Sequence, residues 1–179
     1  PQEIFLKLGF ITKEFMEIYA YAHTKQLILI GKITVGDNVV IGWDPRDPRG
    51  NFTTAIISGV CKAGANALIL GVVPTPLVPM YMLYKNALAG FMVTASHNPK
   101  NQNGIKTFCA FRGLKLLPEN DITLTRAVLN IDPFTLSKVS IKGKRINSRR
   151  EALKLFRQFS LDPGNTWVPS EQTYLFRDI

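Results

Sequence analysis

The sequence predicts an α/β protein, with a three-layer α/β/α domain around a mixed sheet followed by the start of a second domain. Apolar runs of strand length alternate with segments whose apolar residues recur at helical spacing. This β-α-β-α-β order is typical of a sheet covered by helices on both faces. The 179 residues, 46% of them hydrophobic, are enough for one core and part of a second.

The first part of the chain has the clearest alternation of helix and strand. Apolar residues at helical spacing over residues 4–22 predict one amphipathic helix. The apolar runs 39–44 and 67–73 predict two strands. Between these strands, Asn51 is the expected N-cap of a helix that ends at Gly64.

The next elements continue the same alternation. Thr75 is the expected N-cap of a helix whose first residue is Pro76. Apolar runs and turn residues predict four more elements: strands over 88–94 and 105–108, a short edge strand over 114–117 and a helix over 118–129.

The organisation changes near residue 133, where the pattern becomes polar and basic. Ser148 and Glu151 have the spacing of a capping box, which predicts a helix from Arg149 to Phe159. Too few residues follow that helix to build a second core. We therefore expect three parts: a first domain over 1–134, a linker over 135–147 and the start of an incomplete second domain over 148–179.

Charge and composition narrow the class of protein. The formal net charge is +9, and residues 138–157 contain eight Lys or Arg and one acid. This segment has no aromatic stacking pattern and no nucleic-acid motif, so we favour a solvated helix face or a linker over nucleic-acid binding. No apolar stretch is long enough to span a bilayer and no leader is present, so we expect a soluble cytoplasmic protein. Cys61 and Cys109 are expected to be buried free thiols.

One polar loop contains the side chains that are candidates for catalysis. It reads Thr-Ala-Ser-His-Asn-Pro over 94–99 and Asn-Gly-Ile-Lys over 103–106. Ser96 follows a predicted strand, at the sheet edge where ligands usually bind, and turn residues should fold Lys106 back toward Ser96 and His97. A serine there can accept and donate a phosphoryl group while an imidazole or amine moves the proton. The alternative is an ordinary solvated loop.

The sequence lacks the motifs that other classes of reaction require. No Gly-x-Ser-x-Gly elbow surrounds Ser96, and the sequence has neither a P-loop nor a dinucleotide-binding glycine pattern. The histidines and cysteines do not have metal-ligand spacing.

Two further motifs accompany the serine loop in the sequence. Residues 42–46 form a Gly-x-Asp-x-Arg turn, and residues 71–76 read Gly-Val-Val-Pro-Thr-Pro. In this order, the three motifs resemble the signature segments of the α-D-phosphohexomutase family, which includes phosphoglucomutases, phosphomannomutases and phosphoglucosamine mutases. The resemblance covers about the first two thirds of the chain and corresponds to the family's first α/β/α domain.

The resemblance implies a reaction and roles for the matching residues. The reaction is that of an intramolecular phosphotransferase of the isomerase class, which moves phosphate between the anomeric and primary hydroxyl positions of a hexose. Ser96 would be the phosphoserine, and a bisphosphorylated hexose would be both intermediate and activator. Lys106 and His97 would transfer protons, and Arg46 and Asn98 would bind phosphate or substrate.

Two of these implied roles need further comment. Arg46 has a second interpretation, a structural pair with Asp44 or Asp47, and the residues alone leave both open. In the family a magnesium ion bridges the phosphoserine and an aspartate cluster. The resemblance therefore implies a Mg²⁺ site to which this chain contributes a phosphate oxygen on Ser96, with the remaining ligands outside it.

The chain also departs from the family pattern. It begins with Pro1, after the place of the family's Thr-Gly-x-Arg-Gly-like motif, and it lacks the Asp-Gly-Asp metal loop, the sugar-selecting loop and the C-terminal phosphate-binding loop. We therefore expect part of a phosphohexomutase, inactive alone, whose partners are its hexose phosphate and the remaining domains of the same protein. The alternative is a non-catalytic phosphate- or partner-binding module. The sequence does not choose among glucose, mannose and glucosamine phosphates.

Overall fold

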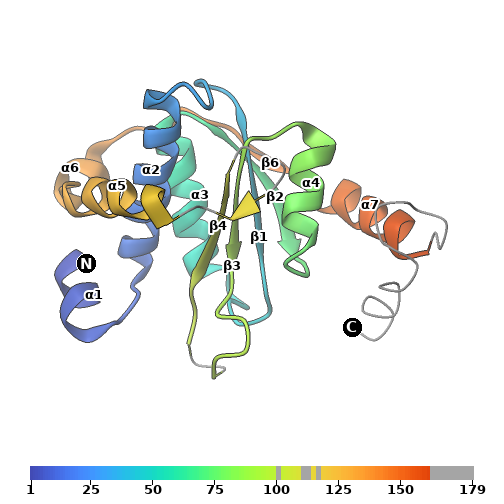
Figure 1. The fold of residues 1–179 in the computed structure, drawn as a ribbon, viewed down its shortest axis with the longest axis horizontal. Helices are drawn as coiled ribbons and strands as arrows, with labels where there is room; N and C mark the ends of the chain where they lie inside the picture. Colours follow the sequence, from blue (N-terminus) through green and yellow to red (C-terminus); the bar gives the residue numbers. More distant parts are fainter. Residues whose placement is uncertain (100–101, 110–113, 116–117, 162–179) are drawn as a thin grey trace.

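A computed structural model describes residues 1–99, 102–109, 114–115 and 118–161. A mixed sheet lies at the centre, with helices on both of its faces (Figure 1). This arrangement confirms the predicted three-layer α/β fold. Among the described residues, no helix has both the length and the apolar character needed to cross a membrane.

In the described part of the chain the sheet has six strands: β1 (Asn38–Trp43), β2 (Asn66–Val72), β3 (Ala89–Val93), β4 (Ile105–Cys109), β5 (Leu114–Lys115) and β6 (Arg145–Asn147). Their spatial order is β5-β4-β3-β1-β2-β6. β1 pairs in parallel with β2 and β3, and β6 pairs in parallel with β2. β4 is antiparallel to β3, and β5 is antiparallel to β4. The carboxyl ends of β1, β2 and β3 therefore meet at one edge.

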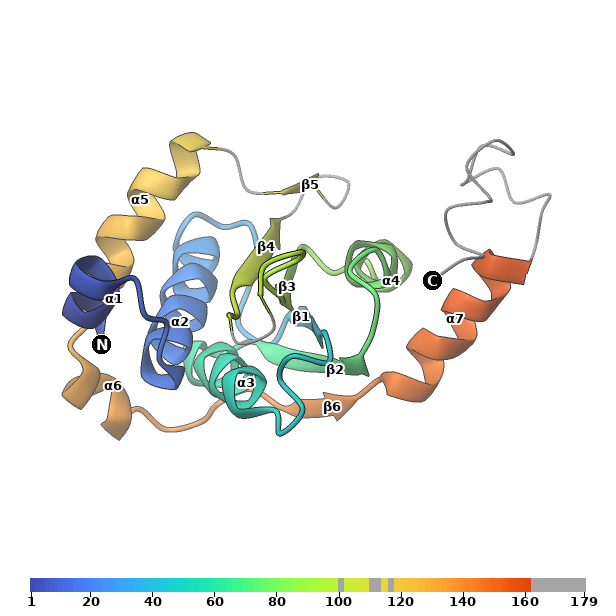
Figure 2. The ribbon, with the colours of Figure 1, turned by 90° about the horizontal axis from the view of Figure 1, so that it is seen from below.

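Helices cover the two faces unequally. α2 (Lys13–Leu29) and α3 (Asn51–Ala63) lie on one face, and α4 (Leu77–Lys85) and α7 (Arg149–Leu161) lie on the other (Figure 2). Three more helices stand beside α2, away from the sheet: α1 (Gln2–Leu8), α5 (Pro118–Leu129) and α6 (Pro133–Lys138).

Both faces of the central strands are buried. Val39 and Ile41 pack toward α2 and α3, whereas Val40 packs with the residues of α4. All three side chains are fully buried. Burial on both faces explains why these strands read as continuous apolar runs in the sequence.

The N-terminal helix predicted over residues 4–22 is instead two helices. Gly9, with φ 68°, ends α1, and the Thr12 hydroxyl caps α2 by accepting a hydrogen bond from the Phe15 amide at 3.1 Å. Phe5 then stacks on Phe15, with ring centroids 4.4 Å apart. The apolar spacing continues through the break, so periodicity alone did not reveal it.

The start of α3 also differs from the prediction. Asn51 is the first helical residue, and Gly50, with φ 66°, is the N-cap. The Asp47 carboxylate satisfies the helix terminus by accepting from the amide and the hydroxyl of Thr53, at 2.8 and 2.7 Å. The predicted end at Gly64 is confirmed.

Thr75 is not the cap of α4. The helix begins at Leu77 with Pro76 as its N-cap, and no side chain caps it. Backbone carbonyls close the turn instead, because the amides of Leu77 and Val78 donate to Pro74 and Thr75 at 3.0 and 3.2 Å. The Thr75 side chain is therefore available to the pocket described below.

The segment expected as a linker over 135–147 contains the end of α6 and strand β6. The backbone amides of Lys142 and Gly143 donate to the Cys61 carbonyl at 3.0 and 2.9 Å, which guides the chain into its pairing with β2. The side chains of the short strand β6 are exposed, so this segment of the sequence shows no apolar pattern. The expected domain boundaries stay predictions, and residues 162–179 lie outside the described residues.

The helix predicted from Arg149 is confirmed as α7, but the capping box is wrong. The Ser148 amide donates to a carbonyl of β2 rather than to Glu151. The Glu151 carboxylate accepts from the Tyr81 hydroxyl at 2.5 Å and from Lys85 Nζ at 2.6 Å. Glu151 therefore ties α7 to α4.

Candidate functional site

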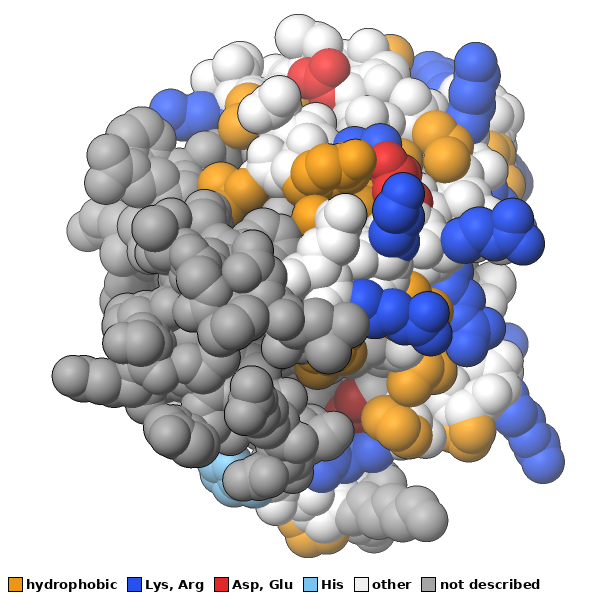
Figure 3. Space-filling model, turned by 90° about the vertical axis from the view of Figure 1, so that its right-hand side faces the viewer, with side chains coloured by type: hydrophobic (Ala, Val, Ile, Leu, Met, Phe, Trp, Pro, Cys, Tyr) orange, Lys and Arg blue, Asp and Glu red, His pale blue; other side chains and the backbone are white. Residues whose placement is uncertain are grey.

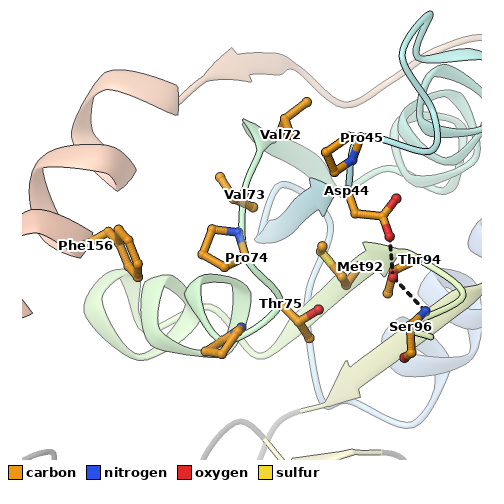
Figure 4. A pocket seen from close by; sticks show the side chains of 11 residues that line it. Asp44, Pro45, Val72, Val73, Pro74, Thr75, Met92, Thr94, Ser96 and Phe156 are labelled. Atoms are coloured by element: carbon orange, nitrogen blue, oxygen red, sulfur yellow. Dashed lines mark hydrogen bonds between the residues drawn. The ribbon is translucent and has the colours of Figure 1, made fainter. Parts of the chain in front are cut away.

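The three loops that follow β1, β2 and β3 enclose a pocket of about 520 Å³ at the sheet edge (Figure 4). Each loop contains one of the three sequence motifs. The pocket is lined by Asp44, Pro45, Val72, Val73, Pro74, Thr75, Pro76, Met92, Thr94, Ser96 and Phe156. The fold thus brings motifs that are far apart in the sequence to one site.

The pocket has a polar end and an apolar end. Asp44, Thr94 and Ser96 lie together on one side, and Phe156 from α7 lies across the pocket from them (Figure 4). Pro74 lies on the wall between the two ends. Among the described lining residues, the polar side chains are those of Asp44, Thr75, Thr94 and Ser96.

The serine loop, residues 94–104, is the connection of a β-hairpin between β3 and β4. The Thr94 amide donates to the Gly104 carbonyl at 3.0 Å, and the Asn98 amide donates to the Ala95 carbonyl at 3.1 Å. The antiparallel pairing of β3 with β4 confirms that the chain folds back after the loop.

Ser96 is held in an uncommon backbone conformation. It is exposed, and its φ of 56° lies in the left-handed region that residues other than glycine rarely adopt. Its amide donates to the Thr94 hydroxyl oxygen at 3.0 Å. The loop therefore presents the Ser96 side chain at the rim of the pocket.

Asp44 is the hub of the polar end. Its Oδ2 accepts from the Thr94 hydroxyl at 2.6 Å and from Arg46 Nη1 at 2.8 Å, while Oδ1 accepts from the Arg46 amide at 2.9 Å. Arg46 Nη2 donates to the Asn98 carbonyl at 2.9 Å. Arg46 thus makes both the pair with Asp44 and a contact with the serine loop, and a phosphate contact stays a prediction.

Comparison with known proteins identifies the family. Residues 7–133 match the family described as phosphoglucomutase/phosphomannomutase, alpha/beta/alpha domain I. The chain belongs to this phosphohexomutase family. The fold agrees, since a phosphoglucomutase/phosphomannomutase family protein from Burkholderia thailandensis aligns over 85% of this chain and 32% of its own, with a TM-score of 0.61 and 19% identity.

Relatives in the phosphohexomutase family are considerably longer than this chain. A phosphoglucosamine mutase from Syntrophus aciditrophicus is 38% identical over 108 residues, which cover 59% of this chain and 24% of that protein. A protein named "Probable phosphoglucosamine mutase" from Pyrococcus abyssi is 32% identical over 163 residues, covering 85% of this chain and 36% of its own length. The chain therefore spans about a third or less of these relatives.

The remaining residues singled out in the sequence lie around Ser96. Lys106 pairs with Met92 across the hairpin, so strand alternation places it on the sheet face that carries α4, although it does not line the pocket. His97 is exposed. Asn98 contributes its backbone carbonyl to Arg46 rather than its side chain.

Sequence reasoning missed the structural importance of Thr94 and Asp44. Thr94 was seen as the end of a strand, and Asp44 only as a partner for Arg46. Their contact depends on β1 lying beside β3, which no local pattern reveals. The available signal was the polar residue that ends each of these two apolar runs.

Gly42 fits the close packing beneath the pocket. A Cβ at this position would lie 2.6 Å from Val73 Cγ2 and 2.8 Å from Val78 Cγ2. A side chain there would push the Pro-Thr-Pro loop and α4 away from β1.

The described residues do not fit a complete magnesium site by themselves. They contain no group of three or more His, Cys, Asp or Glu side chains placed to hold a metal ion. The Asp44 carboxylate, which lines the same pocket as Ser96, is already engaged by Arg46 and Thr94.

Proposed function

We propose that this chain is the phosphoserine-bearing part of a phosphohexomutase. The observation that carries the proposal is the position of Ser96, which is exposed and held in a left-handed conformation at the polar end of a pocket formed by all three motif loops. Such a residue is accessible to a sugar phosphate and fixed in orientation, as group transfer requires.

In the proposed reaction, phosphate moves in two transfers. A hydroxyl oxygen of the hexose phosphate bonds to the phosphorus on Ser96 and gives up its proton to a base at the site. The bond from phosphorus to Ser96 Oγ breaks, and Ser96 Oγ gains a proton. The bisphosphorylated sugar then turns over. Ser96 Oγ takes the other phosphoryl group, losing its own proton, and the released sugar oxygen gains one.

Lys106 and His97 are the proposed partners in these transfers. His97 follows Ser96 directly on the exposed loop, where an imidazole can exchange protons with a bound hydroxyl. Lys106 sits on the pocket side of β4, from which its ammonium would attract the transferring phosphoryl oxygens. Arg46 and Asn98 act here mainly by holding the loop.

For magnesium, we propose that this chain supplies a phosphate oxygen on Ser96 and that the other ligands come from elsewhere in the whole protein. A bound Mg²⁺ would neutralise phosphoryl charge. The isolated 179 residues should not turn over hexose phosphates, because the family's metal and sugar-selecting loops are not in this sequence.

The relatives guide the choice of substrate. Several are named phosphoglucosamine mutases, so glucosamine phosphate is the first hexose to test, ahead of glucose and mannose phosphates. The remaining domains of the same protein are the proposed partners of this one.

The test is tandem mass spectrometry of the full-length protein after incubation with a bisphosphorylated hexose. We expect one added phosphoryl group on Ser96, none in Ser96→Ala, and an unchanged signal in Ser140→Ala, which removes another exposed serine hydroxyl. A wild-type protein without phosphate on Ser96 would contradict the proposal and favour the non-catalytic binding module. Turnover by the isolated 179 residues would contradict only the prediction that they are inactive alone.

A further inference from the structure

We propose that Thr94, held by Asp44, is a positioning residue that sets the backbone conformation of Ser96 for phosphoryl transfer. This inference rests on the proposed function and adds a pair of residues to it. The two residues lie on different strands, Asp44 after β1 and Thr94 after β3, and both line the pocket.

The hydrogen bonds of Thr94 have a fixed direction. A threonine hydroxyl has one proton to donate. The Asp44 carboxylate can only accept, so that proton points to Oδ2 at 2.6 Å and the oxygen lone pairs are left for the Ser96 amide at 3.0 Å. Thr94 is 5% exposed, so water does not readily replace either partner. The hydroxyl is therefore an oriented acceptor for the Ser96 amide.

That acceptor matters because the Ser96 backbone is strained. A φ of 56° is a costly conformation for a residue with a Cβ. The exposed side chain makes no hydrogen bond with the described residues that would offset this cost. Without the Thr94 hydroxyl, Ser96 is free to return to an ordinary conformation, which moves its Oγ away from the pocket.

Asp44, which holds Thr94, is itself fixed by several hydrogen bonds. Its amide donates to the Val93 carbonyl at 3.1 Å, and its carboxylate is held by the backbone and the side chain of Arg46. Through Thr94 it reaches the amide of Ser96, and through Arg46 it reaches the carbonyl of Asn98. The Asp44 carboxylate therefore holds both ends of the segment Ser96–Asn98, one through Thr94 and the other through Arg46.

A purely structural role for Thr94 is the alternative, and Thr107 offers a matched control. Thr107 lies on β4, is 4% exposed and shares a hydrogen bond with the Tyr19 hydroxyl at 3.1 Å, on the opposite face of the sheet. Thr94→Val and Thr107→Val each remove one buried hydroxyl from the sheet, so they should lower stability comparably. Only Thr94→Val should affect the chemistry of Ser96.

The first measurement is the rate of Ser96 phosphorylation in the full-length protein, followed by mass spectrometry across concentrations of a bisphosphorylated hexose. We expect Thr94→Val to lower the maximal rate about 100-fold, the effect of an ångström-scale misplacement, with little change in the half-saturating concentration. Thr94→Ser, which keeps the hydroxyl, and Thr107→Val should both retain the wild-type rate.

The second measurement does not depend on catalysis. Amide hydrogen exchange at Ser96, followed by NMR, should accelerate in Thr94→Val and stay unchanged in Thr107→Val. Wild-type phosphorylation rates or unchanged Ser96 exchange in Thr94→Val would overturn the role of Thr94 while leaving the proposed function standing. A wild-type protein that takes no phosphate on Ser96 would overturn the proposed function and this role together.

Discussion

His23 is a buried histidine on α2 that the proposed chemistry does not use. It is 2% exposed, its ring packs edge-on against Phe91 with centroids 5.4 Å apart, and its Nε2 has no partner among the described residues. Burial lowers the pKa of His23 from 6.5 to about 4. The His23 imidazole is therefore protonated at a lower pH in the folded protein than in the unfolded chain.

This histidine predicts acid sensitivity of the fold. Between pH 6.5 and about pH 4 the unfolded state binds the extra proton, so stability falls as the pH falls through this window and the loss is complete below it. From pH 7 to pH 5 the loss attributable to His23 should be about 2 kcal/mol. Urea unfolding at the two pH values measures it. His23→Phe should lack this part of the loss, and an equal loss in both proteins would contradict the assignment.

At the scale of elements, α2 and α3 approach closely because of Gly59. A Cβ at position 59 would overlap the carbonyl oxygen of Glu17 and lie 2.9 Å from the amide nitrogen of Tyr21. Both atoms belong to the α2 backbone, which cannot rotate away as a side chain can. This close approach lets buried side chains of α2 and α3 pack in one core with those of β1 and β3.

Gly59→Ala should therefore separate these helices and lower the free energy of unfolding by about 3 kcal/mol, at the upper end for an overpacked core. Thr54→Ala, on the exposed side of the same helix, is the control and should change stability by less than about 0.5 kcal/mol. Thermal unfolding measures both. A Gly59→Ala protein as stable as the control would show that the helices do not cross this tightly.

The elements also show what the sequence could predict. Strands β1, β2 and β3 were predictable because burial on both faces makes their central residues a continuous apolar run. Strand β6 was not, because its three residues pair with β2 while their side chains are exposed and form no apolar run. At the site, motifs singled out Ser96 and Arg46. The Thr94–Asp44 contact required knowing which strands are neighbours.

At the scale of the whole molecule, α7 closes the apolar end of the pocket. Ala152 and Leu155 pack it against the α4 face of the sheet, and Phe156 lines the pocket. Lys and Arg side chains gather on this side of the molecule (Figure 3). Arg150, Lys154 and Arg157 of α7 are exposed, and such a surface would attract anionic sugar phosphates.

The link between α7 and α4 depends on Glu151. Tyr81 is fully buried, and burial together with the hydrogen bond to Glu151 raises the pKa of its hydroxyl. Because the Glu151 side chain is 41% exposed, its ion pair with Lys85 contributes little by itself. The larger effect of removing Glu151 is to leave the Tyr81 hydroxyl without its acceptor.

Glu151→Ala should lower the free energy of unfolding by about 1–2 kcal/mol and speed proteolytic cleavage within α7. Glu151→Gln keeps an oxygen acceptor for Tyr81 and should lose less. Glu3→Gln, at an ion pair on α1 that is almost fully exposed, should have no effect. Equal cleavage rates in Glu151→Ala and the wild type would show that this contact does not hold α7.

The central claim is that Ser96 carries phosphate between two positions of a hexose. The most direct test is ³¹P NMR of the full-length protein with glucosamine 1-phosphate, glucose 1-phosphate or mannose 1-phosphate. A catalytic amount of the corresponding bisphosphate is added in each case. We predict that the anomeric phosphate signal is replaced by the primary phosphate signal for at least one sugar, and that Ser96→Ala abolishes this conversion. Conversion by Ser96→Ala at the wild-type rate, or no conversion of any of the three sugars by the wild type, would contradict the account.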